Sequence, residues 1–153
     1  MVRISRLTDY GIVLLTHMAS HPERMYTASE AAAEAHLPLP TVSKLLRRLA
    51  KQRLLASHRG VKGGYGLARP PEEMTVASVV AALEGPIAIT TCSGSTPSDC
   101  QHEGRCPVRT HWNLINLAVR QALDSITLAD LAGPPRQMVV PMLGVPQLGG
   151  EAR

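Results

Sequence analysis

Residues 27–51 read TASEAAAEAHLPLPTVSKLLRRLAK and contain two helix-start signals separated by a proline-containing turn. Thr27 and Glu30 have the spacing of a capping box, which predicts a short Ala-rich helix. Pro40 is expected at the first position of the next helix, where a backbone N–H is not needed. Two short helices joined by a tight turn predict a helix-turn-helix.

The second helix of this pair has an apolar face and a polar, cationic face. Val42, Leu45, Leu46 and Leu49 recur at helical spacing and are expected to face the core. The opposite face carries side chains that can reach base edges and phosphates: Thr41, Ser43, Lys44, Arg47, Arg48 and Lys51. We interpret it as a DNA-recognition helix, because an ordinary surface helix normally mixes acidic with basic residues.

A glycine-rich turn follows the recognition helix. Two short extended runs, 54–58 and 65–67, flank this turn and predict a β-hairpin. Arg59 and Lys62 lie near its tip, where either could enter a minor groove. The order of elements predicts a winged helix, so the expected fold class is mainly α with a small β-wing.

The distribution of charge supports a nucleic-acid partner. Residues 35–71 contain eight basic side chains and no acidic one, although the whole chain has 16 basic and 12 acidic residues. Aromatic side chains are scarce, which disfavours the base-stacking surfaces of single-strand and RNA binders and leaves double-stranded DNA. The sequence contains no phosphate loop, nucleophile elbow or HExxH motif, so we expect a regulator and not an enzyme.

Helices on both sides of this region are expected to complete a winged helix-turn-helix domain over residues 1–85. Thr8 is the predicted N-cap of the first helix, and Asp9 lies in its first turn. Thr75 is expected to cap a fourth helix that ends at Gly85. The apolar run in the first helix is too short to span a membrane and lacks a clear cleavage site, which indicates a cytoplasmic protein.

All three cysteines of the chain lie in the cysteine-rich loop predicted over residues 86–106, at Cys92, Cys100 and Cys106. Their gaps of seven and five residues are wider than the C-x(2–4)-C knuckles of zinc sites. Thiolates are soft ligands, so the spacing favours an iron–sulfur cluster. A zinc site or a thiol-redox or nitric-oxide sensor remains the alternative. A disulfide with one spare thiol is less favoured, because the cysteine count is odd.

Residues 107–132 are expected to form a long dimerisation helix, with Thr127 capping one further turn. Apolar residues recur there at alternating steps of four and three, as in a coiled-coil seam: Val108, Trp112, Ile115, Val119, Ala122 and Ile126. Such a seam favours a homodimer, which also matches palindromic DNA. Residues 133–153 are rich in Gly and Pro without periodicity and predict a disordered tail.

Taken together, these motifs resemble the Rrf2 family of bacterial transcriptional regulators, from Met1 to about Ala132. The matching signatures are the three cysteines, Leu7-Thr-Asp-Tyr-Gly11, Arg59-Gly-Val-Lys-Gly-Gly-Tyr65 and Ile126-Thr-Leu-Ala-Asp-Leu131. The regulators of SUF iron–sulfur assembly operons are the most similar branch, notably at Pro40-Thr-Val-Ser-Lys44 and at Arg109 with Trp112. The resemblance implies a dimeric repressor whose cysteines hold a [2Fe-2S] or [4Fe-4S] cluster, with cluster state setting operator affinity.

The resemblance leaves the fourth cluster ligand open. IscR-type members have a histidine three residues after the third cysteine, and this chain has Arg109 there. NsrR-type members use the aspartate of the Leu-Thr-Asp-Tyr signature from the partner subunit, which corresponds to Asp9. Asp9 is therefore a candidate fourth ligand, and stabilisation of its own helix is the alternative role. The other local candidates are His102, Glu103 and His111.

Overall fold

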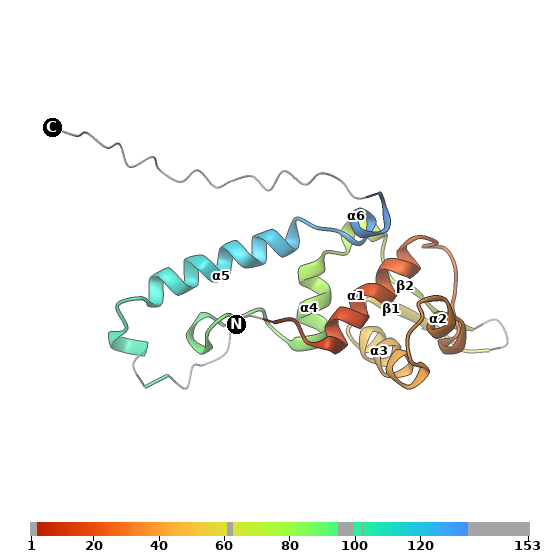
Figure 1. Cartoon of the computed structure of the whole chain (residues 1–153), viewed down its shortest axis with the longest axis horizontal. Coiled ribbons are helices and arrows are strands. Elements are labelled where there is room, and N and C mark those ends of the chain that lie inside the picture. The colour runs from red at the N-terminus through yellow and green to blue at the C-terminus, as the bar shows by residue number, and fades with distance from the viewer. Residues whose placement is uncertain (1–2, 61–62, 95–99, 102, 135–153) are drawn as a thin grey trace.

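The computed structural model describes residues 3–60, 63–94, 100–101 and 103–134. The helices and strands, in chain order, are α1 (Arg6–Ala19), α2 (Ala28–Glu34), α3 (Leu39–Lys51), β1 (Leu55–His58), β2 (Gly64–Leu67), α4 (Val76–Glu84), α5 (Arg109–Asp124) and α6 (Leu128–Ala132). Short 3-10 turns are η1 (Pro71–Glu73), η2 (Thr91–Ser93) and η3 (Glu103–Arg105). Figure 1 shows α5 at one end of the molecule and the paired strands at the other, with α4 between α5 and α1.

The first helix starts earlier than the sequence pattern predicts. Ser5 is the N-cap of α1, and its Oγ accepts a hydrogen bond from the Thr8 N–H at 3.2 Å. The prediction that Thr8 caps this helix is wrong, because Thr8 is fully buried within the first turn. Gly11 allows α1 to lie close against α4, since a Cβ at this position would collide with the Leu83 side chain.

The helix-turn-helix is confirmed. Thr27 and Glu30 form the capping box of α2, with the Thr27 N–H donating to Glu30 Oε2 at 2.8 Å. Helix α3 begins one residue before Pro40, which still occupies the first turn, where the missing N–H has no cost. The predicted inward face of α3 is completely buried in the shared core: Val42, Leu45, Leu46 and Leu49.

The predicted hairpin is also confirmed, so the fold is a winged helix. Strands β1 and β2 are antiparallel, with Leu55 opposite Leu67 and His58 opposite Gly64. Tyr26 extends this sheet, because its N–H donates to Tyr65 O at 2.9 Å and its carbonyl accepts from Tyr65 N at 2.8 Å. Gly64 is required beside Tyr26, since a Cβ there would meet the Tyr26 backbone at 2.6 Å.

The segment 107–132 contains two helices that pack in different places. Helix α5 ends at Asp124, and the capping box of Thr127 and Asp130 starts α6. Leu128 is fully buried in the same core as α1 and α3. Its N–H donates to Met74 O at 2.8 Å, so α6 is held against the segment that leads into α4. The core of the winged-helix head, which comprises α1–α4 and the hairpin, therefore also includes α6 and extends beyond the expected boundary at residue 85.

Two residues of the expected seam lie outside α5. Val108 is the N-cap of the helix, and Ile126 follows its C-terminus. The carbonyl of Ile126 accepts the Val76 N–H at 2.8 Å, which ties this linker to the start of α4. Of the predicted tail, Gly133 and Pro134 are described and residues 135–153 lie outside the described part of the chain. No helix in the described residues is long and apolar enough to cross a membrane.

We predict that Leu128→Ala lowers the free energy of unfolding of the head by about 2–5 kcal/mol, because it leaves a cavity in a core that α6 shares with α1 and α3. Denaturant unfolding followed by circular dichroism measures this change. The matched control is Leu131→Ala in the same helix, where the side chain is 38% exposed and we expect a loss below about 1 kcal/mol. Equal losses in both variants would contradict the placement of α6 in the core.

Candidate DNA interface and cysteine segment

The exposed face of α3 is cationic. Burial of its leucines turns Lys44, Arg47, Arg48 and Lys51 outward, and all four side chains are exposed. Thr41 and Ser43, in its first half, are partly buried. The Arg47 Nε donates to the carbonyl of Ser43 at 3.1 Å, so this side chain lies along its own helix. Within the described residues no carboxylate forms a salt bridge with these cations. The face therefore keeps a net positive charge toward solvent.

Further cations follow α3 in the chain. Arg59 is exposed where β1 ends, next to Gly60, whose φ of +115° makes the turn. Lys62, the other predicted wing residue, lies outside the described residues. Arg53 is a further exposed cation, held at a φ of +60° between α3 and β1, and it was not among the predicted contacts. The sequence feature that could have identified it is its place within residues 35–71, which contain no acidic side chain.

A polar cluster fixes α2 relative to α1. Both terminal nitrogens of Arg24 donate to the Glu34 carboxylate, at 3.1 and 2.7 Å, and His17 Nε2 lies 3.0 Å from the same group. The hydrogen bonds from Arg24, and then from His17, hold the pKa of Glu34 below its ordinary value. The Arg24 guanidinium also lies 4.4 Å from the ring centre of the buried Tyr26. These contacts hold the helix that precedes α3 in position.

None of the three cysteines forms a disulfide, and each is partly buried. The Thr90 hydroxyl lies 3.4 Å from Cys92 Sγ. Within the described residues no three His, Cys, Asp or Glu side chains lie close enough to hold one metal ion. The three thiols therefore have the donor chemistry of a cluster site, but they are not gathered around one centre in this structure.

The candidate fourth ligands lie on different elements. Asp9 is exposed in the first turn of α1 and is not part of a common ligand set with the cysteines. His111 is exposed on α5, and Glu103 begins η3. His102 lies outside the described residues.

Asn116 links the cysteine segment to α5, and sequence reasoning did not identify it. It is the buried residue of α5 and is 4% exposed. Its Oδ1 accepts from the Ile89 N–H at 3.1 Å, and its Nδ2 donates to the carbonyls of Ile87 and Ser93 at 3.2 and 3.0 Å. Cys92 lies within this segment, so its backbone is fixed to the middle of α5. The available signal was a polar residue one turn after Trp112 on an otherwise apolar face.

The predicted seam on α5 is divided between two environments. Trp112 and Val119 are partly buried against their own chain, whereas Ile115 is 46% exposed and Ala122 is exposed. Leu114 and Leu117 are also 60% and 50% exposed. Exposed apolar side chains therefore occur on more than one side of α5, and exposed apolar surface can mark an interaction site.

Comparison with known sequences gives consistent matches. The model of the Rrf2 family, described as an iron-dependent transcriptional regulator, matches residues 4–134. An HTH-type transcriptional regulator of Mycobacterium tuberculosis is 31% identical over 134 residues, which cover 86% of this chain and 82% of the relative. IscR of Serratia proteamaculans is 29% identical over 140 residues, which cover 91% of this chain and 84% of that protein.

Solved structures with the same fold include two kinds of regulator. CymR of B. subtilis, described as the global cysteine regulator, has a TM-score of 0.66 at 31% identity and covers 86% of this chain and 97% of its own. IscR of T. potens has a TM-score of 0.63 at 29% identity, over 85% of each chain. The oxidised form of CymR from Staphylococcus aureus has a TM-score of 0.64 at 28% identity, over 88% of this chain and 99% of its own.

We predict that Asn116→Leu speeds hydrogen exchange at the Ile89 amide roughly five- to tenfold, because one buried hydrogen bond contributes about 1–1.5 kcal/mol. Amide exchange measured by NMR or mass spectrometry detects the change. Asn113→Leu, an exposed site one turn earlier on the same helix, is the control and should leave the Ile89 amide unchanged. If the Asn116 variant also exchanges at the native rate, the side chain does not hold this segment.

Proposed function

This chain belongs to the Rrf2 family of transcriptional regulators, and we propose that it is a dimeric, DNA-binding repressor of SUF-type iron–sulfur assembly genes in the cytoplasm. In this proposal the cysteines hold an iron–sulfur cluster, and the state of that cluster sets the affinity for operator DNA. The observation that carries the proposal is the Asn116 carboxamide, which connects the cysteine segment to α5.

The DNA-binding part of the proposal rests on α3 and the wing. The exposed cations of α3 can neutralise phosphates, while Thr41, Ser43 and Lys44, at its first turns, are suited to read base edges in a major groove. Arg59 is exposed at the end of β1, where a wing can follow the neighbouring minor groove. The absence of acidic residues from 35 to 71 favours approach to a polyanion.

The cluster part rests on the chemistry of the donor set. Cys92, Cys100 and Cys106 are partly buried and form no disulfide, and they lie on a segment with little regular structure. The proposed ligands are these three thiolates, with Asp9 from the partner subunit as the fourth. A bound cluster would supply an iron centre that responds to oxidation or to loss of iron. Asn116 then transmits any rearrangement of residues 87–93 to α5.

The dimer part rests on the exposed face of α5. Val108, Ile115 and Ala122 are exposed on one side of the helix, while Trp112 and Val119 are partly occupied by contacts within the chain. We therefore propose that the interface is narrower than the predicted seam and is centred on Ile115. A two-fold dimer through α5 would present two recognition helices to a palindromic site.

A thiol-based redox sensor is the second candidate. The absence of a disulfide at all three cysteines, together with the structural similarity to CymR, including its oxidised form, favours it. Anaerobic purification with a visible spectrum and iron and sulfide analysis separates the candidates. A cluster protein is brown with stoichiometric iron and sulfide, whereas a thiol or zinc sensor is colourless.

For DNA binding, we predict different effects of two substitutions. Lys44→Ala should relax base preference, because a good base contact contributes about 1–3 kcal/mol of discrimination. Arg59→Ala should weaken binding to all duplexes and reduce the salt dependence by about one phosphate contact. Titrations of matched and mismatched duplexes at several salt concentrations measure both, with Arg6→Ala on α1 as the control. Unchanged binding by both variants would refute the proposed interface.

For dimerisation, we predict that Ile115→Asp yields a monomer in sedimentation experiments, because burial of two unpaired carboxylates in the interface costs several kcal/mol. Leu117→Asp is the matched control. Leu117 is equally exposed but lies about 160° away around the helix, so this variant should remain a dimer. A dimeric Ile115 variant would place the interface elsewhere.

For the cluster, we predict that replacement of any one of the three cysteines by Ala abolishes the visible absorbance of the protein and leaves its helical content unchanged. Asp9→Ala should instead keep the absorbance but bleach faster in air, because an exchangeable oxygen ligand has been lost. If Asp9 only stabilises its own helix, Asp9→Ala would lower the stability of the protein by about 0.3–1 kcal/mol, and the cluster would bleach at the native rate. That second outcome would remove Asp9 from the ligand set.

A further inference from the structure

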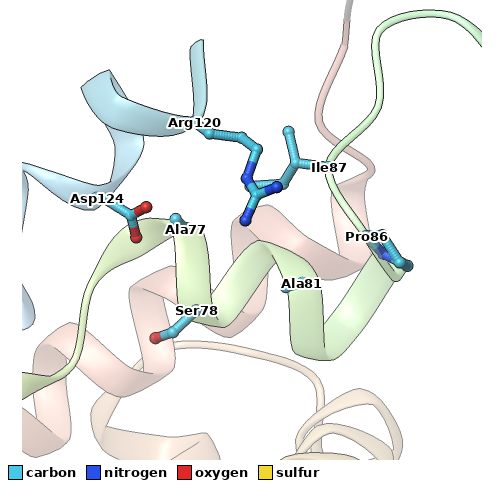
Figure 2. Close-up of a pocket in the computed structure, with 7 residues that line it drawn as sticks. All are labelled: Ala77, Ser78, Ala81, Pro86, Ile87, Arg120 and Asp124. Carbon is cyan, nitrogen blue, oxygen red and sulfur yellow. The ribbon is translucent and has the colours of Figure 1, made fainter. Parts of the chain in front are cut away.

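A cavity lies between the DNA-binding head and α5, outside the proposed DNA, cluster and dimer sites. Its volume is about 450 Å³, within the range of roughly 300–1,000 Å³ typical of small-molecule sites. The cavity is lined by α4, the residues that follow α4, and α5: Ala77, Ser78, Ala81, Pro86, Ile87, Arg120 and Asp124. Figure 2 shows the Arg120 side chain extending from α5 across toward Ile87 and α4.

Two features of α4 leave room for a ligand. Ala77 and Ala81 are one turn apart and present only methyl groups, so α4 contributes no large side chain to this cavity. Ser78 directs its hydroxyl to the carbonyl of Thr75 at 2.6 Å, so it does not fill the cavity with an extended polar group. The floor is therefore small and apolar.

The polar groups of the cavity carry opposite charges. Arg120 and Asp124 are four residues apart on α5 and line the same cavity. Within the described residues they do not form a salt bridge with each other. The basic residue precedes the acidic one, which is the less favourable order for a pair within a helix. The cavity therefore keeps an open cation and an open anion a short distance apart.

Asp124 is held in place by its surroundings. Its Oδ1 accepts a hydrogen bond at 3.1 Å from the Thr75 hydroxyl, which also caps α4. A carboxylate has about four acceptor sites, so most of its capacity remains for a ligand. The negative charge also disfavours phosphates and dicarboxylates, which Arg120 alone would attract.

From this arrangement we propose that the cavity is an effector site for a small zwitterion of the α-amino-acid class. The ligand's carboxylate pairs with Arg120, its ammonium group pairs with Asp124, and a short apolar side chain lies over Ala77 and Ala81. Charge-assisted hydrogen bonds of this kind provide both orientation and affinity.

The position of the cavity gives the ligand a means of regulation. The ligand contacts α4 in the head and α5, and it also contacts Ile87, whose carbonyl is bound by Asn116. A bound ligand would hold these three parts in one arrangement, which would set the position of the head relative to α5. By thermodynamic linkage, the ligand and the operator must change each other's affinity by the same factor.

The test is a calorimetric titration of the full-length protein, without DNA, with each of the 20 standard amino acids up to 10 mM. Propionate and ethylamine provide the carboxylate and the ammonium group alone. We expect saturable binding of at least one small apolar amino acid, and no binding of either fragment in the same concentration range.

Arg120→Gln should weaken binding by at least about tenfold, as for the loss of a charge-assisted hydrogen bond. Ala81→Leu, which fills the cavity and suits a helix, should abolish it.

Arg6→Gln removes an exposed arginine that does not line the cavity and should bind like the wild type. Circular dichroism and thermal midpoints establish that each variant is folded. The site is overturned if no amino acid binds saturably, or if the Arg120 and Ala81 variants bind with the affinity of the wild type. A duplex recovered from random sequence with this protein then tests regulation. The saturating amino acid should change the affinity for that duplex in the wild type but not in the Arg120 variant, and an unchanged affinity in the wild type overturns the effector role.

Discussion

The side-chain carboxamide of Asn116 is the interaction on which the connection between the cysteine segment and α5 depends. It makes three hydrogen bonds to the backbone of residues 87–93, a segment with one short 3-10 turn and no longer regular element. Leaving a buried backbone group without a partner costs about 1–3 kcal/mol, so this segment cannot move away from α5 without losing its hydrogen bonds together. A rearrangement at Cys92 must therefore either move with α5 or break this link.

The head on the other side of this link is held together because α1 and α6, which are far apart in sequence, both contribute to its core. Leu128 from α6 is fully buried beside residues of α1, α3 and α4. At the opposite end of α4, the Ser5 N–H donates to Glu84 at 2.7 Å, and this contact lowers the pKa of Glu84. Helix α4 is thus fixed to the head at both ends, and it also faces α5. A change in the position of α5 therefore reaches the head through α4 and through α6, which follows α5 in the chain and is packed in the same core.

Elements whose sequence motifs are local could be predicted from the sequence alone. The apolar spacing of α3, the capping boxes at Thr27 and Thr127, and the glycines of the wing all predicted structure correctly, because each depends on residues close in sequence. The predicted N-cap of α1 was wrong because Ser5 and Thr8 both carry a hydroxyl group that can cap a helix. Asn116 was missed because its partners are 23 to 29 residues away. Such long-range contacts, like the cavity between α4 and α5, leave no periodic signal in the sequence.

The most direct test is the operator affinity of the anaerobically purified protein, measured with the proposed cluster loaded and after its removal, in the wild type and in Asn116→Leu. The account predicts that cluster removal changes the affinity of the wild type. In the variant, the affinity should become nearly independent of the cluster, although the visible absorbance of the cluster is retained. A variant that keeps the full difference between its two forms would contradict the claim that Asn116 connects the cysteine segment to the DNA-binding head.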